Sequence, residues 1–160
     1  MDDSSVFDVV IENPLHSTVR TVYEEGRGWV ETGLVFQVPL PAEYGFIPGT
    51  CNAADGDPAD VLVIGSEPTW TGCRYRARAI GLLLRADGDH KVLAVPHTAA
   101  YISPLHDVAE VAPEVLRRIE DWFRPYFELR GWDDARRAVE WIGACRAAAG
   151  SERLQGEPGA

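Results

Sequence analysis

The chain has 160 residues, with 15 Lys and Arg against 25 Asp and Glu and a formal net charge of −10 at pH 7. This length suits one domain with its own hydrophobic core. The acidic balance excludes the clustered basic surface that proteins use to bind nucleic acids or anionic membranes, so we expect no partner of either kind.

The first hundred residues have the patterns of β-strands joined by short turns. Apolar or alternating runs predict strands over 6–11, 19–23, 29–38, 61–64, 74–84 and 92–95. Glycine-containing turns lie at 25–28 and 87–89. Together these strands favour a small closed or nearly closed barrel.

After Pro113 the apolar residues recur at helical spacing and predict two helices. The first helix would run from Pro113 to near Gly131, with an apolar side made of Leu116, Ile119, Trp122, Phe123 and Tyr126. The second helix would be capped by Asp133 and end before Gly150, with an apolar side made of Ala135, Ala138, Val139, Ile142 and Cys145. We therefore predict an α+β fold in one domain over 1–150, followed by a polar, flexible tail over 151–160.

The cysteines and the N-terminus indicate a cytoplasmic protein. Cys51, Cys73 and Cys145 are widely spaced, odd in number and form no C-x-x-C pattern, as expected of reduced thiols. The first five residues are acidic and polar, so they lack the basic region that begins a signal peptide. No apolar run reaches about 18 residues, and we expect no segment that spans a membrane.

The strongest functional signal is a turn with three carboxylates, Asp55, Asp57 and Asp60, which leads into the apolar strand 61–64. Two carboxylates about 5 Å apart repel by roughly 3 kcal/mol at an effective dielectric constant near 20, so their convergence requires a cation or raised pKa values. Oxygen ligands of this kind select Mg²⁺, Mn²⁺ or Ca²⁺. The alternative is a solvated turn whose Asp and Gly residues serve only the backbone geometry. An EF-hand loop fits less well, because Asp60 stands where its Gly is required and Ser66 where its last Glu ligand is required.

A second acidic turn, with Asp87 and Asp89, precedes Lys91 and another apolar strand. If both turns meet at one mouth of a barrel, their carboxylates would hold two or more Mg²⁺ ions, with Lys91 as a phosphate donor. Lys91 is the only lysine of the chain, and a lysine taken alone is more often a surface charge.

Ordered segments over residues 9–142 resemble family I inorganic pyrophosphatases. The matching segments are 10–12, 44–50, 55–63, 72–73, 78–81, 91–96 and the helix that carries Trp122, Phe123 and Tyr126. The resemblance implies an OB-like five-stranded β-barrel with two C-terminal helices. It also implies a homo-oligomer that hydrolyses a small phosphate-containing substrate, pyrophosphate, with several Mg²⁺ ions.

The same resemblance implies a role for each matching residue. Asp55, Asp60 and Asp89 would be metal ligands, with Asp87 as a further one, and Glu12 would act on another metal ion or its waters. Asp57 would be the base that activates the attacking water. Lys91, Tyr44 and Tyr126 would contact phosphate oxygens, although both tyrosines would also fit core positions.

Several phosphate-binding positions of the family are replaced. The second-strand lysine and glutamate fall on Arg20 and Val22, or, with an insertion, on Val22 and Glu24. Arg20 would then be the remaining basic contact. An arginine falls on Thr32, a tyrosine on Leu40 and a lysine on Phe127, and no hairpin is expected between the two helices. The metal ligands are therefore retained while the cationic contacts are incomplete.

These replacements leave three hypotheses open. Each charge-assisted contact to phosphate is worth roughly 1.5 to 3 kcal/mol, so we expect a divergent paralogue with weak turnover of pyrophosphate. The first hypothesis is Mg²⁺-dependent hydrolysis of pyrophosphate or of an organic diphosphate. The second is a repurposed enzyme of a specialised pathway that acts on a non-pyrophosphate ligand in the same cleft. The third is a non-catalytic regulator that assembles through the inherited oligomer surface.

Overall fold

Five strands close into a barrel in the computed structural model, which describes residues 4–156 and their side chains up to residue 151. The strands of the ring are β1 (Val6–Asn13), β4 (Glu43–Phe46), β5 (Asp60–Val63), β7 (Lys91–Pro96) and β6 (Arg74–Arg85). Strand β6 pairs back with β1, which closes the ring. All pairs are antiparallel except β5 and β7, which run parallel. The five-stranded barrel predicted from the resemblance is confirmed.

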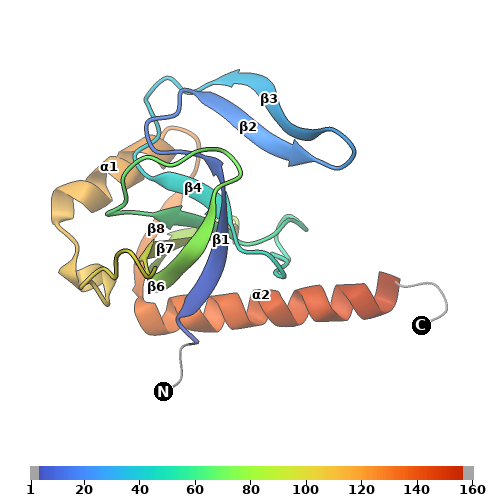
Figure 1. Cartoon of the computed structure of the whole chain (residues 1–160). Coiled ribbons are helices and arrows are strands. Elements are labelled where there is room, and N and C mark those ends of the chain that lie inside the picture. Colours follow the sequence, from blue (N-terminus) through green and yellow to red (C-terminus); the bar gives the residue numbers. More distant parts are fainter. Residues whose placement is uncertain (1–3, 157–160) are drawn as a thin grey trace.

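Strands β2 (Val19–Glu24) and β3 (Gly28–Val35) form a separate two-stranded hairpin. Figure 1 shows this hairpin above one end of the barrel, while helix α2 (Ala135–Gly156) runs along the opposite side. Helix α1 (Pro113–Phe123) follows the short helix η1 (Val108–Glu110). The hairpin therefore lies on the side of the barrel away from α2.

Strands β5 and β7 are buried on both faces, which explains their continuous apolar sequences. One face contributes Val61, Val63, Val92 and Ala94 to a core that includes Ala138, Ile142 and Cys145 of α2. The other face contributes Leu62, Leu93 and Val95 to a core that includes Ile119 and Phe123 of α1. The apolar sides predicted for the two helices thus pack on opposite faces of the same strands.

The segment between the helices differs from the prediction. Helix α1 ends at Phe123 rather than near Gly131, because Pro125 lacks the N–H that would continue the helical hydrogen bonds. Residues of β8 (Leu129–Asp134) then pair with the outer edge of β6. The predicted continuation of the first helix to near Gly131 is therefore wrong, and the single strand β8 separates the two helices.

The ends of α2 also differ from the prediction. Asp134, not Asp133, accepts a hydrogen bond from the backbone N–H of Arg137 at 3.0 Å and caps the helix. The helix continues through Gly150 to Gly156, so the predicted end before Gly150 is wrong. The last four residues of the expected tail lie outside the described residues, and the single domain over 1–150 stays a prediction. Within residues 4–156, none of the helices has the length and hydropathy of a membrane span.

Candidate active site

The structure brings together Asp55, Asp60 and Asp89, each with one carboxylate oxygen within 4.8 Å of the other two. Asp55 lies in the loop between β4 and β5, Asp60 begins β5, and Asp89 lies in the turn between β6 and β7. The parallel register of β5 and β7 places Asp60 opposite Lys91, so the turn before β7 arrives beside the start of β5. Two acidic turns that are distant in sequence therefore meet.

Hydrogen bonds hold the loop of Asp55 in shape. The backbone N–H of Asp57 donates to the Asp55 carboxylate at 2.9 Å. Asn52, which is buried, donates through its side-chain amide to Asp89 at 2.9 Å and receives a bond from the N–H of Ala54 at 3.0 Å. The sequence analysis missed Asn52, because an Asn before an acidic turn is indistinguishable from an ordinary turn residue.

Lys91 is the positive charge of this cluster. Its side chain is only 2% exposed, and its Nζ lies 2.5 Å from Asp60 Oδ2 and 3.1 Å from Asp89 Oδ2. The same Nζ lies 5.9 Å from the centre of the Tyr44 ring. The alternative that Lys91 is a surface charge is therefore wrong.

Burial raises the pKa values of three carboxyl groups here, those of Asp55, Asp60 and Glu12. The pKa of Asp60 is raised by burial although Lys91 opposes the shift, and the pKa of Asp55 is raised by burial although a backbone hydrogen bond opposes it. Burial, and next the charge of Asp60, raise the pKa of Glu12 to about 7. The negative charge is thus incompletely compensated by Lys91, and converging hard oxygen donors of this kind fit a divalent cation.

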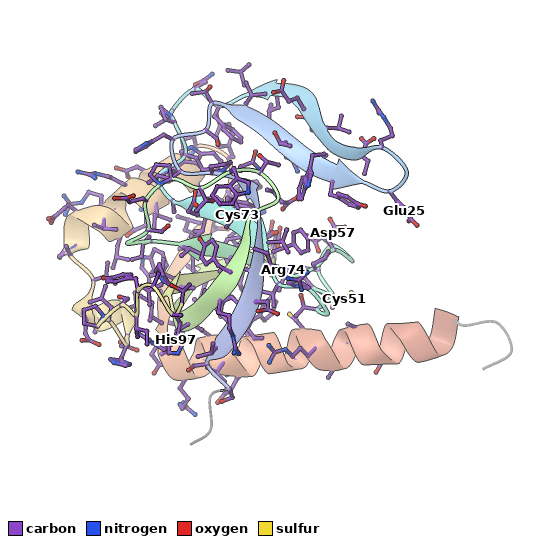
Figure 2. All side chains as sticks on the ribbon, in the orientation of Figure 1. Glu25, Cys51, Asp57, Cys73, Arg74 and His97 are labelled. Carbon is purple, nitrogen blue, oxygen red and sulfur yellow. The ribbon has the colours of Figure 1, made fainter. Side chains whose placement is uncertain are left out.

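A cavity of about 1030 Å³ adjoins the cluster. The barrel mouth, the β2–β3 hairpin and the residues after α1 contribute to its walls. The predicted site residues in its lining are Glu12, Arg20, Tyr44, Asp57, Asp60, Asp89, Lys91 and Tyr126. Figure 2 shows the loop that carries Asp57 beside the barrel, with Asp57 toward the hairpin and Cys51 toward α2.

Burial is also the main reason that the pKa of Tyr44 lies well above its ordinary value, with the charges of Asp60, Asp89 and Glu12 adding to the shift. The Tyr44 phenol therefore stays protonated at neutral pH, and its O–H can donate a hydrogen bond to an anion. Tyr126 is exposed on the segment after α1 and borders the same cavity.

Asp87 is the predicted ligand that the structure does not bring into the cluster. Arg85 binds its carboxylate through Nη2 at 2.5 Å and through Nε at 3.1 Å. This hydrogen bonding is the main reason that the pKa of Asp87 is lowered. A metal role for Asp87 stays a prediction, whereas its contact with Arg85 orders the turn before β7.

Arg85 is a cavity residue that the sequence analysis missed. Its side chain is 6% exposed, it borders the cavity, and its Nη1 lies 3.5 Å from Asp89 Oδ2. Its guanidinium carbon lies 3.4 Å from the centre of the Phe127 ring. The only sequence signal was an arginine at the end of a strand and directly before an acidic turn.

The replaced positions lie mostly on the cavity wall. Arg20 and Val22 of β2 both line the cavity, whereas Glu24 pairs with Arg27 at 3.0 Å and is absent from the lining. This placement favours the alignment of the second strand without an insertion. Leu40 and Phe127 also line the cavity. Thr32 lies elsewhere, where its hydroxyl donates to the backbone carbonyl of Arg20 at 3.2 Å.

Comparison with known proteins identifies the family. A family model described as inorganic pyrophosphatase matches residues 9–150. The chain belongs to the inorganic pyrophosphatase family. The inorganic pyrophosphatase of Streptomyces coelicolor is 37% identical over 152 residues, which are 92% of each chain. That of Halalkalibacterium halodurans is 34% identical over 157 residues, 91% of this chain and 96% of its own.

Solved structures of the family share the whole fold. The crystal structure of the inorganic pyrophosphatase from Thermus thermophilus has a TM-score of 0.83 and 30% identity, and covers 91% of this chain and 92% of its own. The corresponding structure from Ehrlichia chaffeensis has a TM-score of 0.81 and 30% identity, with coverage of 91% and 96%. The predicted family and hydrolase class are therefore confirmed. These inorganic pyrophosphatases give no support to the alternative of a repurposed enzyme.

Proposed function

We propose that this protein hydrolyses inorganic pyrophosphate with the help of Mg²⁺. The observation that carries the proposal is the convergence of Asp55, Asp60 and Asp89 beside buried Lys91, at the edge of a large cavity. Mg²⁺ suits such a site because it is commonly held by a few carboxylates together with waters and substrate phosphates. When bound, the ion neutralises charge on phosphate oxygens and lowers the pKa of water.

The residues of this chain supply positioning and proton transfer. Asp57 lies exposed on the cavity wall and would accept a proton from the attacking water. The water oxygen then bonds to one phosphorus while the bridging P–O bond breaks, which releases two phosphates. Lys91 and Tyr44 would hold phosphate oxygens in line, Lys91 as a cation and Tyr44 as a neutral donor.

A second candidate substrate is an organic diphosphate that carries an apolar group. Val22, Leu40 and Phe127, which replace charged or polar residues, all line the cavity. Leu34 and Val35 of the hairpin add exposed apolar side chains to the same lining. Such a wall stabilises an organic group better than a second bare phosphate.

The predicted cellular setting and assembly also stay proposals. Cys51, Cys73 and Cys145 are buried thiols, which suits a reducing cytoplasm. Trp70 and Ile102 are large apolar side chains that are exposed outside the cavity. Their burial against another copy of the chain would support a homo-oligomer.

The experiment measures phosphate release from pyrophosphate and from several organic diphosphates, with Mg²⁺ and with a chelator. We expect release to stop on chelation and to fall roughly 100-fold or more in Asp57→Asn, because a positioned base contributes about that much. Asp8→Asn is the control, since Asp8 is exposed on β1 and absent from the cavity lining. Release that survives both chelation and Asp57→Asn would overturn the proposal.

A further inference from the structure

We propose that Arg85 and Phe127 form a phosphoryl-binding subsite of the cavity, in which Arg85 supplies the positive charge expected from a lysine at position 127. The inference rests on the proposed function, because it concerns how the same cavity holds a diphosphate. Neither the resemblance nor the metal cluster assigns a role to Arg85. The evidence is the position of its guanidinium, its stacking partner and the donors that remain available.

Stacking fixes the plane of the guanidinium. Its carbon lies 3.4 Å from the centre of the Phe127 ring, which is a close cation–π contact. Both side chains border the same cavity, although they come from β6 and from the segment after α1. Because the ring covers one face of the guanidinium, the N–H donors extend from its edges rather than toward Phe127.

The described contacts of Arg85 leave donors for a ligand. A guanidinium has five N–H groups. One on Nε and one on Nη2 are used by Asp87, and one on Nη1 points to Asp89 at 3.5 Å. One hydrogen on each terminal nitrogen remains, and these two donors are available to oxygens of a phosphoryl group.

The surroundings favour a phosphoryl group over other anions. Arg85 shares Asp89 with Lys91, since the Nζ of Lys91 lies 3.1 Å from the same carboxylate oxygen, Asp89 Oδ2. A ligand held between these two cations would therefore lie directly beside the candidate metal ligands. A diphosphate satisfies both demands because it binds divalent ions and offers several oxygens. Phe127 thus takes the place of a positively charged lysine, and its ring orients the positively charged guanidinium of Arg85.

The test measures binding of methylenediphosphonate, a diphosphate analogue that resists hydrolysis, by calorimetry in the presence of Mg²⁺. We expect Arg85→Met to weaken binding roughly 10- to 100-fold, the value of one charge-assisted contact. Arg74→Met is the matched control, because Arg74 lies on the same strand but is exposed and absent from the cavity lining. The control should bind like the wild type.

A rescue variant separates the subsite from a structural role of Arg85. In Arg85→Met with Phe127→Lys, the new lysine should restore binding to within about fivefold of the wild type, because one cationic contact replaces the other. Thermal unfolding shows which variants fold. Arg85→Lys, which keeps the charge and loses the fork, replaces Arg85→Met if the latter does not fold.

Two results would overturn the subsite: binding of the analogue by Arg85→Met within twofold of the wild type, or a loss that Phe127→Lys does not repair. The outcome is independent of turnover. If the wild type binds the analogue through Arg85 but does not hydrolyse pyrophosphate, the proposed function fails and the subsite stands. If pyrophosphate is hydrolysed and Arg85→Met binds normally, the subsite fails alone.

Discussion

Replacing Lys91 with methionine tests whether the carboxylate cluster requires a positive charge. Methionine keeps most of the volume and the apolar stem of lysine but removes the ammonium group. The variant leaves Asp60 and Asp89 without their nearest cation in the metal-free protein. We expect a large loss of stability without divalent ions and a partial recovery with them.

The magnitude follows from the two Nζ–O distances. At an effective dielectric constant near 20, charges 2.5 and 3.1 Å apart attract by roughly 7 and 5 kcal/mol before the cost of desolvation. Desolvation offsets much of this, and the removal of one partner from a buried pair typically costs about 3 to 5 kcal/mol. Because the side chains of Asp60 and Asp89 are 17% and 18% exposed, we expect a loss near the lower end, about 3 kcal/mol.

Urea unfolding with a chelator and with Mg²⁺ measures this effect. Mg²⁺ should stabilise Lys91→Met by at least about 1 kcal/mol more than it stabilises the wild type, because the ion takes the place of the missing charge. Arg124→Met is the control, since its ion pairs are exposed and worth about 1 kcal/mol at most. Equal stabilities of Lys91→Met and wild type in the chelator, or equal gains from Mg²⁺, would refute the reasoning.

Two further predictions concern pH and packing. Because the pKa of Glu12 is raised to about 7, its contribution to stability is complete below its unfolded pKa of 4.5 and is lost as the pH rises through 7. The chelated protein should lose about 1 to 2 kcal/mol of unfolding free energy between about pH 5.5 and about pH 8 from this group, and Glu12→Gln should remove that part. In Gly45→Ala the new Cβ would lie 2.2 Å from the Val10 carbonyl oxygen, so urea unfolding should show a loss of at least about 2 kcal/mol. Its control is Gly143→Ala in α2, where nothing lies within 4 Å and a gain of about 0.5 to 1 kcal/mol is expected.

The spacing of apolar residues was sufficient to predict a helix or strand where one regular face of that element is buried. The apolar run before Ile64 predicted β5, and the helical spacing of Ile119 and Phe123 predicted α1, because burial repeats with the period of the element. Strand β4 was missed because Glu43 and Gly45 are unfavourable in an isolated strand and are accepted here through pairing with β1 and β5.

Strand β8 was missed for a related reason. Its sequence contains Gly131 and two aspartates, so no strand pattern is visible, and the apolar residues before it suggested a longer helix. The pairing with β6 supplies the hydrogen bonds that make this segment a strand. A strand that forms only by pairing with a distant strand therefore need not show the spacing of apolar residues that predicts a strand.

Motifs and burial patterns along the chain were enough to identify the family, the acidic loop and the residues of the core. The meeting of Asp60 and Asp89 around Lys91, and the stacking of Phe127 on Arg85, are visible only in the folded structure. The reason is physical: these contacts depend on the parallel register of β5 and β7 and on the return of the chain after α1. The register and the chain return each bring together residues that are far apart in sequence, and no local sequence pattern shows that such residues will meet. The charged groups buried in this way determine the chemistry of the cavity.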